Sequence, residues 1–249
     1  MTSIIAVAGK GGVGKSTLAA LLVRELASRS GKVVLAVDAD PNSNLGEKLG
    51  VEVERTIGDL REDLLKRSDE VTAGGSKQEA MQYQLRLAMV EGRDFDLLTM
   101  GRSEGRGCYC YINNLLRTYL DSIMSDYPYV VIDNEAGMEH LSRRTCQRMD
   151  ALIIVTDATK VGLMTAGRIL ALAREMELEI GSAVLVVNRV KGELPRPLKD
   201  AIPEGFARVA LVPHDQAIED LASSGGPLTS LPRNSTAAQA VRELAGELR

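Results

Sequence analysis

A glycine-rich run near the start of the chain carries the residue types that bind phosphate. The run reads Gly9-Lys10-Gly11-Gly12-Val13-Gly14-Lys15-Ser16-Thr17 and matches the pattern G-x-x-x-x-G-K-[ST]. Glycine tolerates backbone conformations in which successive N–H groups curl around an anion. In such a P-loop the second lysine, Lys15, reaches the β- and γ-phosphates of a nucleotide, and the Ser16 hydroxyl ligates Mg²⁺.

Three aspartates follow apolar runs and could supply the acids of phosphoryl transfer. Asp38 and Asp40 follow the run 33–37, and in an extended backbone they point to the same face. A carboxylate beside Mg²⁺ can orient the water that attacks a phosphate, although Asp40 could instead cap a helix over 42–49. Asp133 ends the run 130–132, the Walker B pattern, in which the acid holds Mg²⁺ directly or through water.

Two cysteines, Cys108 and Cys110, are separated by a single tyrosine. In an extended backbone both thiols project to one side and can grip one soft metal ion. Two ligands do not complete a tetrahedral site, but a two-fold dimer would supply four. A C-x-C pair alone is a weak signal, and two unrelated cysteines explain it equally well. Cys146, in a predicted helix over 140–149, is interpreted as a packing residue.

Alternating apolar and amphipathic stretches predict the elements that position these residues. Strand-like runs lie at 4–8, 33–37, 96–100, 130–132, 152–155, 184–187 and 209–212, and helical stretches include 16–29, 162–176 and 235–248. This alternation predicts an α/β fold with a doubly wound, mostly parallel sheet of seven to eight strands and helices on both faces. We expect residues 1–249 to form a single P-loop domain.

Two segments do not follow this alternation. Residues 49–93 are rich in charge and lack a convincing strand, with helical character at 56–66 and 77–90, so we expect a helical elaboration of the same domain. Residues 191–205 contain three prolines and are predicted to form a loop.

The composition is that of an ordinary globular protein, with 45% hydrophobic residues and a net charge of −4. A negative balance argues against a nucleic-acid surface. No apolar run has the length of a membrane span, and no signal peptide is apparent, so we expect a cytoplasmic protein that binds no membrane. Three cysteines, an odd number, favour reduced thiols or metal ligands over a disulfide framework.

The extra lysine of the P-loop, Lys10, narrows the class. A lysine after the first glycine resembles the deviant P-loop ATPases, which include the septum-site and plasmid-partition ATPases and the nitrogenase iron protein. The resemblance implies a homodimer in which Lys10 reaches the nucleotide of the partner chain. It also implies that Asp40 positions the attacking water, so that Lys10, Lys15 and Asp40 are catalytic, and that residues 134–140 form switch II. His140 is more simply a surface residue.

The same resemblance implies where the base is recognised. Asn188, after the run 184–187, would contact the purine, and Lys191 stands where GTP-specific relatives have an aspartate, so ATP is favoured over GTP. The turn Pro213-His214-Asp215 resembles one that lies beside adenine, although Asp215 could equally cap a helix over 216–222. The predicted cofactor-binding residues are Gly9, Lys10, Gly11, Gly12, Val13, Gly14, Lys15, Ser16, Thr17, Asp38, Asp133, Asn188, Pro213 and Asp215.

Two longer runs resemble one branch of these ATPases. Residues 100–116 and 133–140 are similar to the nickel-insertion accessory ATPases of carbon monoxide dehydrogenase and acetyl-CoA synthase, and the similarity extends over essentially the whole chain. It implies a dimer, opened and closed by ATP, that carries Ni²⁺, or Zn²⁺ as a competitor, on Cys108 and Cys110 of both chains. ATP or ADP, Mg²⁺ and Ni²⁺ are then the cofactors, and carbon monoxide dehydrogenase or acetyl-CoA synthase is the client.

Two other classes of function compete with this one. An iron–sulfur electron-donor ATPase would take its cysteines from separate loops, whereas Cys108 and Cys110 share one loop and residues 134–139 contain no cysteine. A positioning or partition-type ATPase would bind membrane or DNA. The membrane type ends in a basic amphipathic helix, but Arg242, Glu243, Glu247 and Arg249 leave no polybasic face here.

Overall fold

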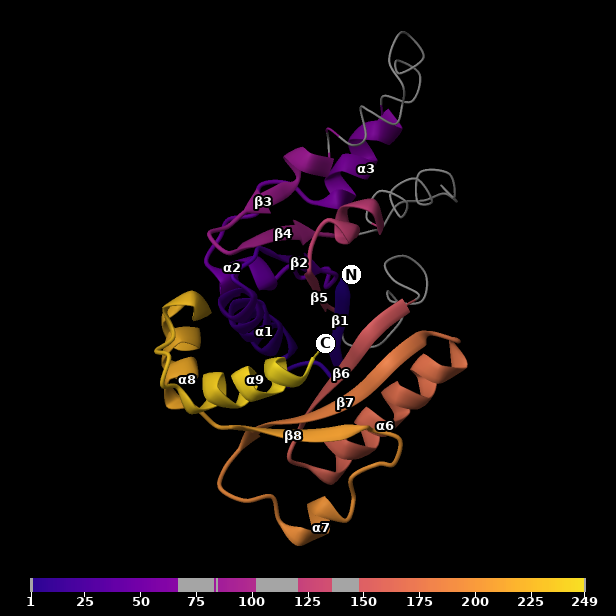
Figure 1. Ribbon diagram of the computed structural model, residues 1–249, viewed down its shortest axis with the longest axis vertical. Helices are drawn as coiled ribbons and strands as arrows, with labels where there is room; N and C mark the ends of the chain where they lie inside the picture. The colour runs from indigo at the N-terminus through magenta and orange to yellow at the C-terminus, as the bar shows by residue number, and fades with distance from the viewer. Residues whose placement is uncertain (1, 67–82, 84, 102–120, 136–147, 249) are drawn as a thin grey trace.

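The computed structural model describes residues 2–66, 83, 85–101, 121–135 and 148–248 (Figure 1). The strands are β1 Ser3–Gly9, β2 Val34–Asp38, β3 Met89–Glu91, β4 Phe95–Thr99, β5 Tyr129–Asp133, β6 Arg148–Asp157, β7 Glu179–Val190 and β8 Arg208–Pro213. The helices are α1 Lys15–Ser30, α2 Leu45–Leu49, α3 Ile57–Lys66, α6 Lys160–Glu175, α7 Arg196–Lys199, α8 Gln216–Ser224, the 3₁₀ turn η2 Leu228–Ser230 and α9 Thr236–Glu247. None of the described helices is long and apolar enough to cross a membrane.

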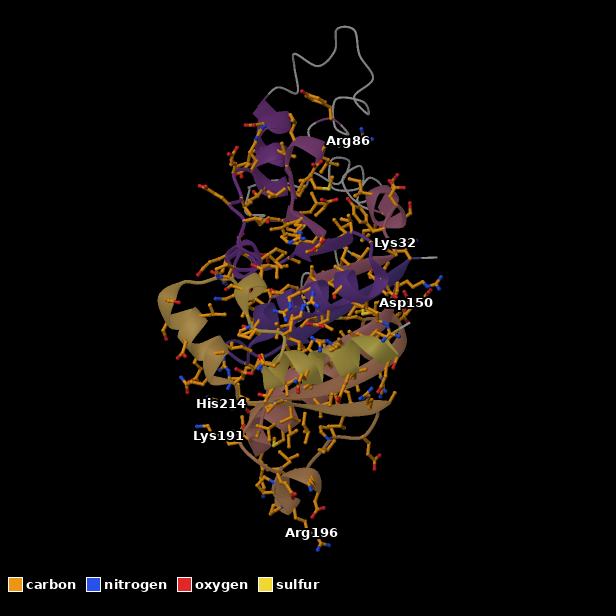
Figure 2. The ribbon with its side chains drawn as sticks, turned by 60° about the vertical axis from the view of Figure 1, so that its left-hand side comes forward. Lys32, Arg86, Asp150, Lys191, Arg196 and His214 are labelled. Atoms are coloured by element: carbon orange, nitrogen blue, oxygen red, sulfur yellow. The ribbon has the colours of Figure 1, made fainter. Side chains whose placement is uncertain are left out.

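The described strands form one eight-stranded sheet in the order β3-β4-β2-β5-β1-β6-β7-β8. Every neighbouring pair is parallel except β3 with β4, which is antiparallel. Figure 2 shows the two edges of this sheet: Lys191 and His214 lie at the carboxyl ends of β7 and β8, whereas Lys32 and Asp150 mark the amino edge. The doubly wound, mostly parallel fold predicted from the sequence is confirmed.

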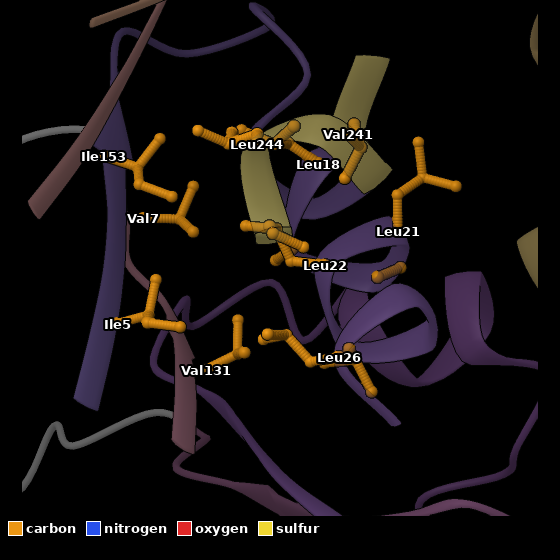
Figure 3. Close-up of a cluster of buried hydrophobic side chains, with 14 of the residues drawn as sticks. Ile5, Val7, Leu18, Leu21, Leu22, Leu26, Val131, Ile153, Val241 and Leu244 are labelled. Atoms are coloured by element: carbon orange, nitrogen blue, oxygen red, sulfur yellow. The ribbon is translucent and has the colours of Figure 1, made fainter. Parts of the chain in front are cut away.

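Alternate residues of the central strands face two different helical layers. On one face, Ile5, Val7, Val131 and Ile153 pack with α1 and α9 through side chains that include Leu18, Leu22, Leu26, Val241 and Leu244 (Figure 3). On the other face, Ala6 and Ile154 pack with α6, and Val37 and Ile132 pack with α3. Strands buried on both faces explain why the apolar runs in the sequence are continuous rather than alternating.

Some predicted boundaries are wrong, and tertiary pairing explains most of the differences. β3 lies in the segment predicted to lack a strand, and it ends the predicted helix 77–90 early: residues 83 and 85–87 are helical, but Met89–Glu91 pairs with β4. Three half-exposed residues carry too weak a pattern to predict a strand, and the Gly92 N–H bond to the Phe95 carbonyl, at 2.8 Å, closes the hairpin.

Three further boundaries differ. The helix predicted over 140–149 cannot extend to its end, because Arg148 and Met149 already pair with β7 as the start of β6. α7, one turn after Pro195, interrupts the predicted loop 191–205. α2 begins at Leu45 rather than at residue 42, because the backbone N–H of Ser43 bonds to the Asp40 carbonyl and forms a turn there.

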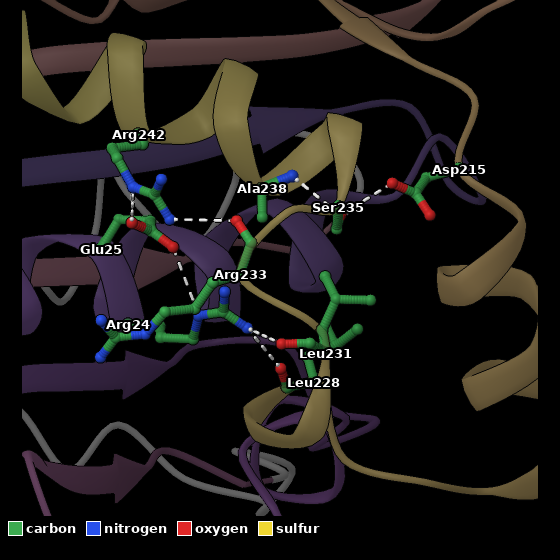
Figure 4. Close-up of polar contacts among 9 residues, drawn as sticks. All are labelled: Arg24, Glu25, Asp215, Leu228, Leu231, Arg233, Ser235, Ala238 and Arg242. Carbon is green, nitrogen blue, oxygen red and sulfur yellow. Dashed lines mark hydrogen bonds and ion pairs between the residues drawn. The ribbon is translucent and has the colours of Figure 1, made fainter.

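A buried carboxylate joins α1 to the C-terminal part of the chain (Figure 4). Glu25, 4% exposed, accepts hydrogen bonds from Arg24 Nε at 3.3 Å and from Arg242 Nε of α9 at 2.8 Å. Arg24 Nη1 also donates to the carbonyls of Leu228 and Leu231, at 3.1 and 2.9 Å. One acid therefore anchors two guanidinium groups between α1, η2 and α9.

We expect the Glu25→Ala variant to lose about 3 kcal/mol of unfolding free energy near pH 7, because Arg24, whose side chain is only 18% exposed, would lose its counter-ion. Urea denaturation followed by circular dichroism measures this loss. The matched control is Glu243→Ala, an exposed acid on α9, for which we expect a change below about 0.5 kcal/mol. Equal stability of the two variants would show that the Glu25 ion pairs do not anchor α9.

Candidate functional site

The P-loop and two aspartates meet at the carboxyl edge of the sheet. In the strand register Val7 lies opposite Asp133, and Asp38 lies opposite Asp133 on its other side. The loop leaves β1 directly after Gly9, so it begins beside both acids. Open α/β sheets bind ligands at this edge, which brings together residues that are more than a hundred positions apart in the chain.

Three glycines give the P-loop its shape. Gly9, Gly12 and Gly14 have φ angles of 151°, 80° and 95°, which side-chain-bearing residues rarely adopt. A Cβ atom on Gly9 would lie 2.3 Å from the Val155 carbonyl oxygen of β6, so only glycine fits there. Gly14 then takes the N-cap position of α1, whose free N–H groups face the inside of the loop.

The loop borders a pocket of about 360 Å³. Its lining residues come from the P-loop, from the segment after β2, and from the ends of β5 and β7: Gly11, Gly12, Gly14, Lys15, Ser16, Thr17, Asp40, Asn42, Asn44, Lys48, Glu135 and Arg189. Lys48, Asn42, Asn44 and Arg189 were not predicted as site residues, and Glu135 was predicted only as part of switch II. Asn42, Glu135 and Arg189 stand within two positions of predicted ones, which is the one signal in the sequence that could have found them.

The two P-loop lysines differ in environment. Lys15 is buried, 7% exposed, and its Nζ donates to the Lys10 carbonyl at 3.4 Å. The Lys10 side chain is exposed. The buried ammonium of Lys15, inside a loop that can surround an anion, can neutralise a bound phosphate. The exposed ammonium of Lys10 can contact a second molecule.

Asp133 is buried and has no hydrogen-bond partner among the described residues for either carboxylate oxygen. Burial raises the pKa of Asp133 to about 7 and outweighs the opposing effects of the Ser16 hydroxyl and the Lys15 ammonium; Asp38 and Asp40 raise it further. The Ser16 hydroxyl is thus close enough to influence the carboxylate without satisfying it in a well-formed hydrogen bond. A carboxylate in this environment is able to bind a hard cation.

Asp38 and Asp40 hold the segment that follows β2. Asp38, fully buried, accepts from the backbone N–H of Asp40 at 3.1 Å and of Leu45, at the start of α2, at 2.9 Å. Burial raises its pKa to about 6, against the effect of these two bonds. Asp40 accepts from the backbone and side-chain nitrogens of Asn42, both at 2.9 Å, and lines the pocket. Asp38 does not line the pocket, so its predicted contact with the cofactor stays a prediction.

The residues predicted to recognise the base have other contacts in this structure. Asn188 Nδ2 donates to the Val13 carbonyl of the P-loop at 2.8 Å. Asp215, two residues after the end of β8, caps α8 through the Ala217 N–H and also accepts from Ser235, Thr236 and Ala237 at the start of α9. Burial alone would raise the pKa of Asp215, but these four hydrogen-bonded groups together lower it. The helix-cap alternative for Asp215 is confirmed; contact with adenine stays a prediction.

The predicted nickel ligands Cys108 and Cys110 lie outside the described residues, as do Cys146, His140 and most of the predicted switch II. Within the described part of the chain, no group of three or more histidine, cysteine, aspartate or glutamate side chains is arranged to hold a metal ion. A cation held by Ser16 and Asp133 would therefore take its remaining ligands from water or from the phosphates of a nucleotide.

The sequence matches known proteins over most of its length. A protein described as an uncharacterised ATP-binding protein of Methanocaldococcus jannaschii is 45% identical over 98% of both chains. The carbon monoxide dehydrogenase accessory protein CooC of Rhodospirillum rubrum is 32% identical over 89% of this chain and 87% of its own. Among solved structures, a ParA family ATPase from Chlorobium tepidum aligns with a TM-score of 0.73 at 22% identity, over 100% of this chain and 99% of its own.

A second solved structure, the septum site-determining protein MinD from Pyrococcus horikoshii in complex with Mg-ADP, aligns with a TM-score of 0.67 at 22% identity, over 99% of this chain and 96% of its own. At this identity the two alignments support the fold. The family model described as "CobQ/CobB/MinD/ParA nucleotide binding domain" matches residues 4–228. The matched residues include the P-loop and the Walker B aspartate. The chain is therefore a P-loop ATPase of the CobQ/CobB/MinD/ParA family.

Proposed function

We propose that the pocket binds ATP with Mg²⁺ and that the P-loop residues have the roles expected from their positions. The buried Lys15 contacts the β- and γ-phosphates, and the N–H groups of residues 11–16 surround them. Ser16 and Asp133 would hold Mg²⁺, which neutralises charge on the phosphates when bound. The unpartnered oxygens of Asp133 beside Ser16 are the observation that supports this assignment.

Hydrolysis needs a group that orients water toward the terminal phosphate, and we assign this role to Asp40. Asp40 lines the pocket, and one of its carboxylate oxygens, Oδ1, is already held by the two nitrogens of Asn42. A carboxylate held in this way has one orientation, and its other oxygen can accept a proton from the water. Lys10, exposed at the rim of the loop, would complete the site of a partner chain in a homodimer.

The cargo that we propose is nickel, carried between the two chains of the dimer on Cys108 and Cys110. The similarity to CooC, which covers 89% of this chain, carries this proposal, together with the C-x-C motif in the sequence. Carbon monoxide dehydrogenase or acetyl-CoA synthase would be the client that receives the ion. We also infer that residues 1–249 form a single domain, since one sheet extends from Ser3 to Pro213.

A partition-type ATPase is the second candidate. The maintenance of carboxysome distribution protein A of Synechococcus elongatus is 32% identical over 71% of this chain, and MinD of Bacillus subtilis is 29% identical over 93%. ATP-dependent co-sedimentation with DNA or with liposomes, in the absence of nickel binding, would favour this candidate over the metallochaperone.

Substitution of the two P-loop lysines should affect different properties of the protein. We expect Lys15→Ala to abolish ATP binding, because Lys15 is the buried ammonium that faces its own chain's phosphates. Lys10→Ala should bind ATP normally but lose hydrolysis and ATP-driven dimerisation. Equilibrium binding and sedimentation velocity measure both properties. Equal loss of ATP affinity in the two variants would contradict a role for Lys10 across the dimer.

The raised pKa of Asp133 predicts a pH-dependent effect on stability. A carboxylate whose pKa is about 7 when folded, above its ordinary 3.8, destabilises the nucleotide-free fold increasingly as the pH rises from 4 to 7. Asp133→Asn removes the charge, so its melting temperature should exceed that of the wild type by several degrees at pH 8 and by less at pH 5.

Thermal denaturation at both pH values tests this effect. The Mg²⁺-dependent part of the stabilisation by ADP should disappear in Asp133→Asn. A variant that is less stable than the wild type at pH 8, or that keeps its response to Mg²⁺, would rule out an unsatisfied magnesium-binding carboxylate.

For the metal, we expect one Ni²⁺ or Zn²⁺ per dimer, and we expect the ion to promote dimerisation without nucleotide. The double variant Cys108→Ala, Cys110→Ala should lose both properties and keep ATP binding, whereas Cys146→Ala serves as the matched control and should keep all three. Metal analysis of anaerobically purified protein, with sedimentation at each nickel ratio, measures them.

Affinity should fall as the pH drops below the thiol pKa values, because thiolates are the ligands. One ion per monomer, or metal binding by the double variant, would contradict the shared site. A brown iron–sulfur chromophore would instead favour the electron-donor class.

A further inference from the structure

Four carbonyl groups of the P-loop accept hydrogen bonds, two of them from β7 outside the loop. The Lys10 carbonyl accepts from Lys15 Nζ at 3.4 Å, and the Gly14 carbonyl accepts from the Leu18 N–H at 3.0 Å. Between them, the Gly12 carbonyl accepts from Arg189 Nη1 at 3.2 Å, and the Val13 carbonyl accepts from Asn188 Nδ2 at 2.8 Å. Carbonyls that bond outward leave the N–H groups of the same peptides free to face an anion.

Both central donors come from the end of β7, in an unusual backbone conformation. Arg189 has a φ of 55°, in the left-handed region, and lies where the pairing of β7 with β8 is irregular, between Val187 and Val190. Its backbone N–H donates to Asn188 Oδ1 at 2.9 Å. A non-glycine residue held in this region is strained, and such strain persists where the surrounding structure or a function requires it.

The Asn188 side chain lies so close to the P-loop that position 14 must be a glycine. A Cβ on Gly14 would lie 2.5 Å from Asn188 Nδ2 and 3.8 Å from Arg189 Nη2. Glycine at position 14 is therefore needed for its own left-handed φ and for the approach of the Asn188 amide. The Asn188 side chain, 8% exposed, already donates to Val13 and accepts from Arg189, so its hydrogen bonds are directed to the protein.

We propose that Arg189 is a positioning residue that, with Asn188, holds the P-loop in its phosphate-binding conformation before a nucleotide arrives. The pair acts on the phosphate half of the ligand, whatever the base. This differs from the sequence-based expectation that Asn188 recognises the purine. The inference rests on the nucleotide site proposed above and is independent of the nickel assignment.

The test compares ligands that carry the phosphates, the base or both. Affinities for MgATP, MgGTP, magnesium tripolyphosphate and adenosine are measured by calorimetry or by competition for Arg189→Ala and Arg189→Lys. The matched control is Arg196→Ala, which removes an arginine whose side chain is 91% exposed on α7. Arg189→Ala should weaken the binding of MgATP, MgGTP and tripolyphosphate by one common factor of about five to ten, since one solvent-exposed hydrogen bond to the loop is lost.

Adenosine affinity should be unchanged in Arg189→Ala, because the base and ribose do not depend on the loop carbonyls. A general loss of structure would instead weaken adenosine together with the phosphates. Arg189→Lys, which keeps a cationic donor, should recover part of the loss, and Arg196→Ala should match the wild type. Amide hydrogen exchange of residues 11–16 in nucleotide-free protein should be faster in Arg189→Ala, because the loop is no longer held.

Wild-type affinity for tripolyphosphate in Arg189→Ala would overturn the proposal, and so would a change in the ratio of ATP to GTP affinity without loss of tripolyphosphate. Failure of the nucleotide site itself gives a different result: Lys15→Ala would then bind MgATP as the wild type does.

Discussion

The burial of α1 against β1, β5 and β6 holds both ends of the nucleotide loop. Leu18, Leu22 and Leu26 are each at most 2% exposed, and each contributes about 1.5–3 kcal/mol of burial free energy. β1 lies at the centre of the sheet, so the residues between Gly9 and Lys15 connect two elements that cannot move apart. A short glycine-rich connection between two rigid ends has few conformations, and the outward bonds of its carbonyls restrict these further.

The same edge of the sheet holds two buried acids, of which Asp38 has hydrogen-bond partners in the fold and Asp133 does not. Asp133 has no partner among the described residues, and burial raises the pKa values of Asp133 and Asp38 to about 7 and about 6. By contrast, the buried acid Glu25, far from this edge, forms ion pairs with Arg24 and Arg242. A buried carboxylate left without a partner, as Asp133 is, is typical of a site that binds a charged ligand.

Much of the fold could be predicted because its signals are local. Buried strands such as β1 and β5 are continuous apolar runs in the sequence. The helix α6 has a buried stripe, and α1 is rich in Leu and Ala and buried on most sides. The predicted ends of each of these elements therefore differ from the observed ones by at most a few residues. β3 could not be recognised, since Met89–Glu91 becomes a strand only by pairing with β4. The end of the helix predicted over 140–149 was wrong for the same reason: Met149 is apolar in either structure, and β7 decides which one forms.

The sequence by itself determined the chemistry of the P-loop, because Gly9, Lys15 and Ser16 act through their own backbone freedom, charge and hydroxyl group. It also determined that Asp38, Asp40 and Asp133 end apolar runs. Only the tertiary structure decided the environment of each acid, since burial and the available hydrogen-bond partners depend on how the elements pack. Asp38 accepts hydrogen bonds from the backbone of Asp40 and Leu45, and Asp215 links α8 to α9. Asn188 donates a hydrogen bond to Val13, which lies 175 positions away in the chain. A residue type states which bonds a side chain can make, and the packing of the elements decides which partners are within reach.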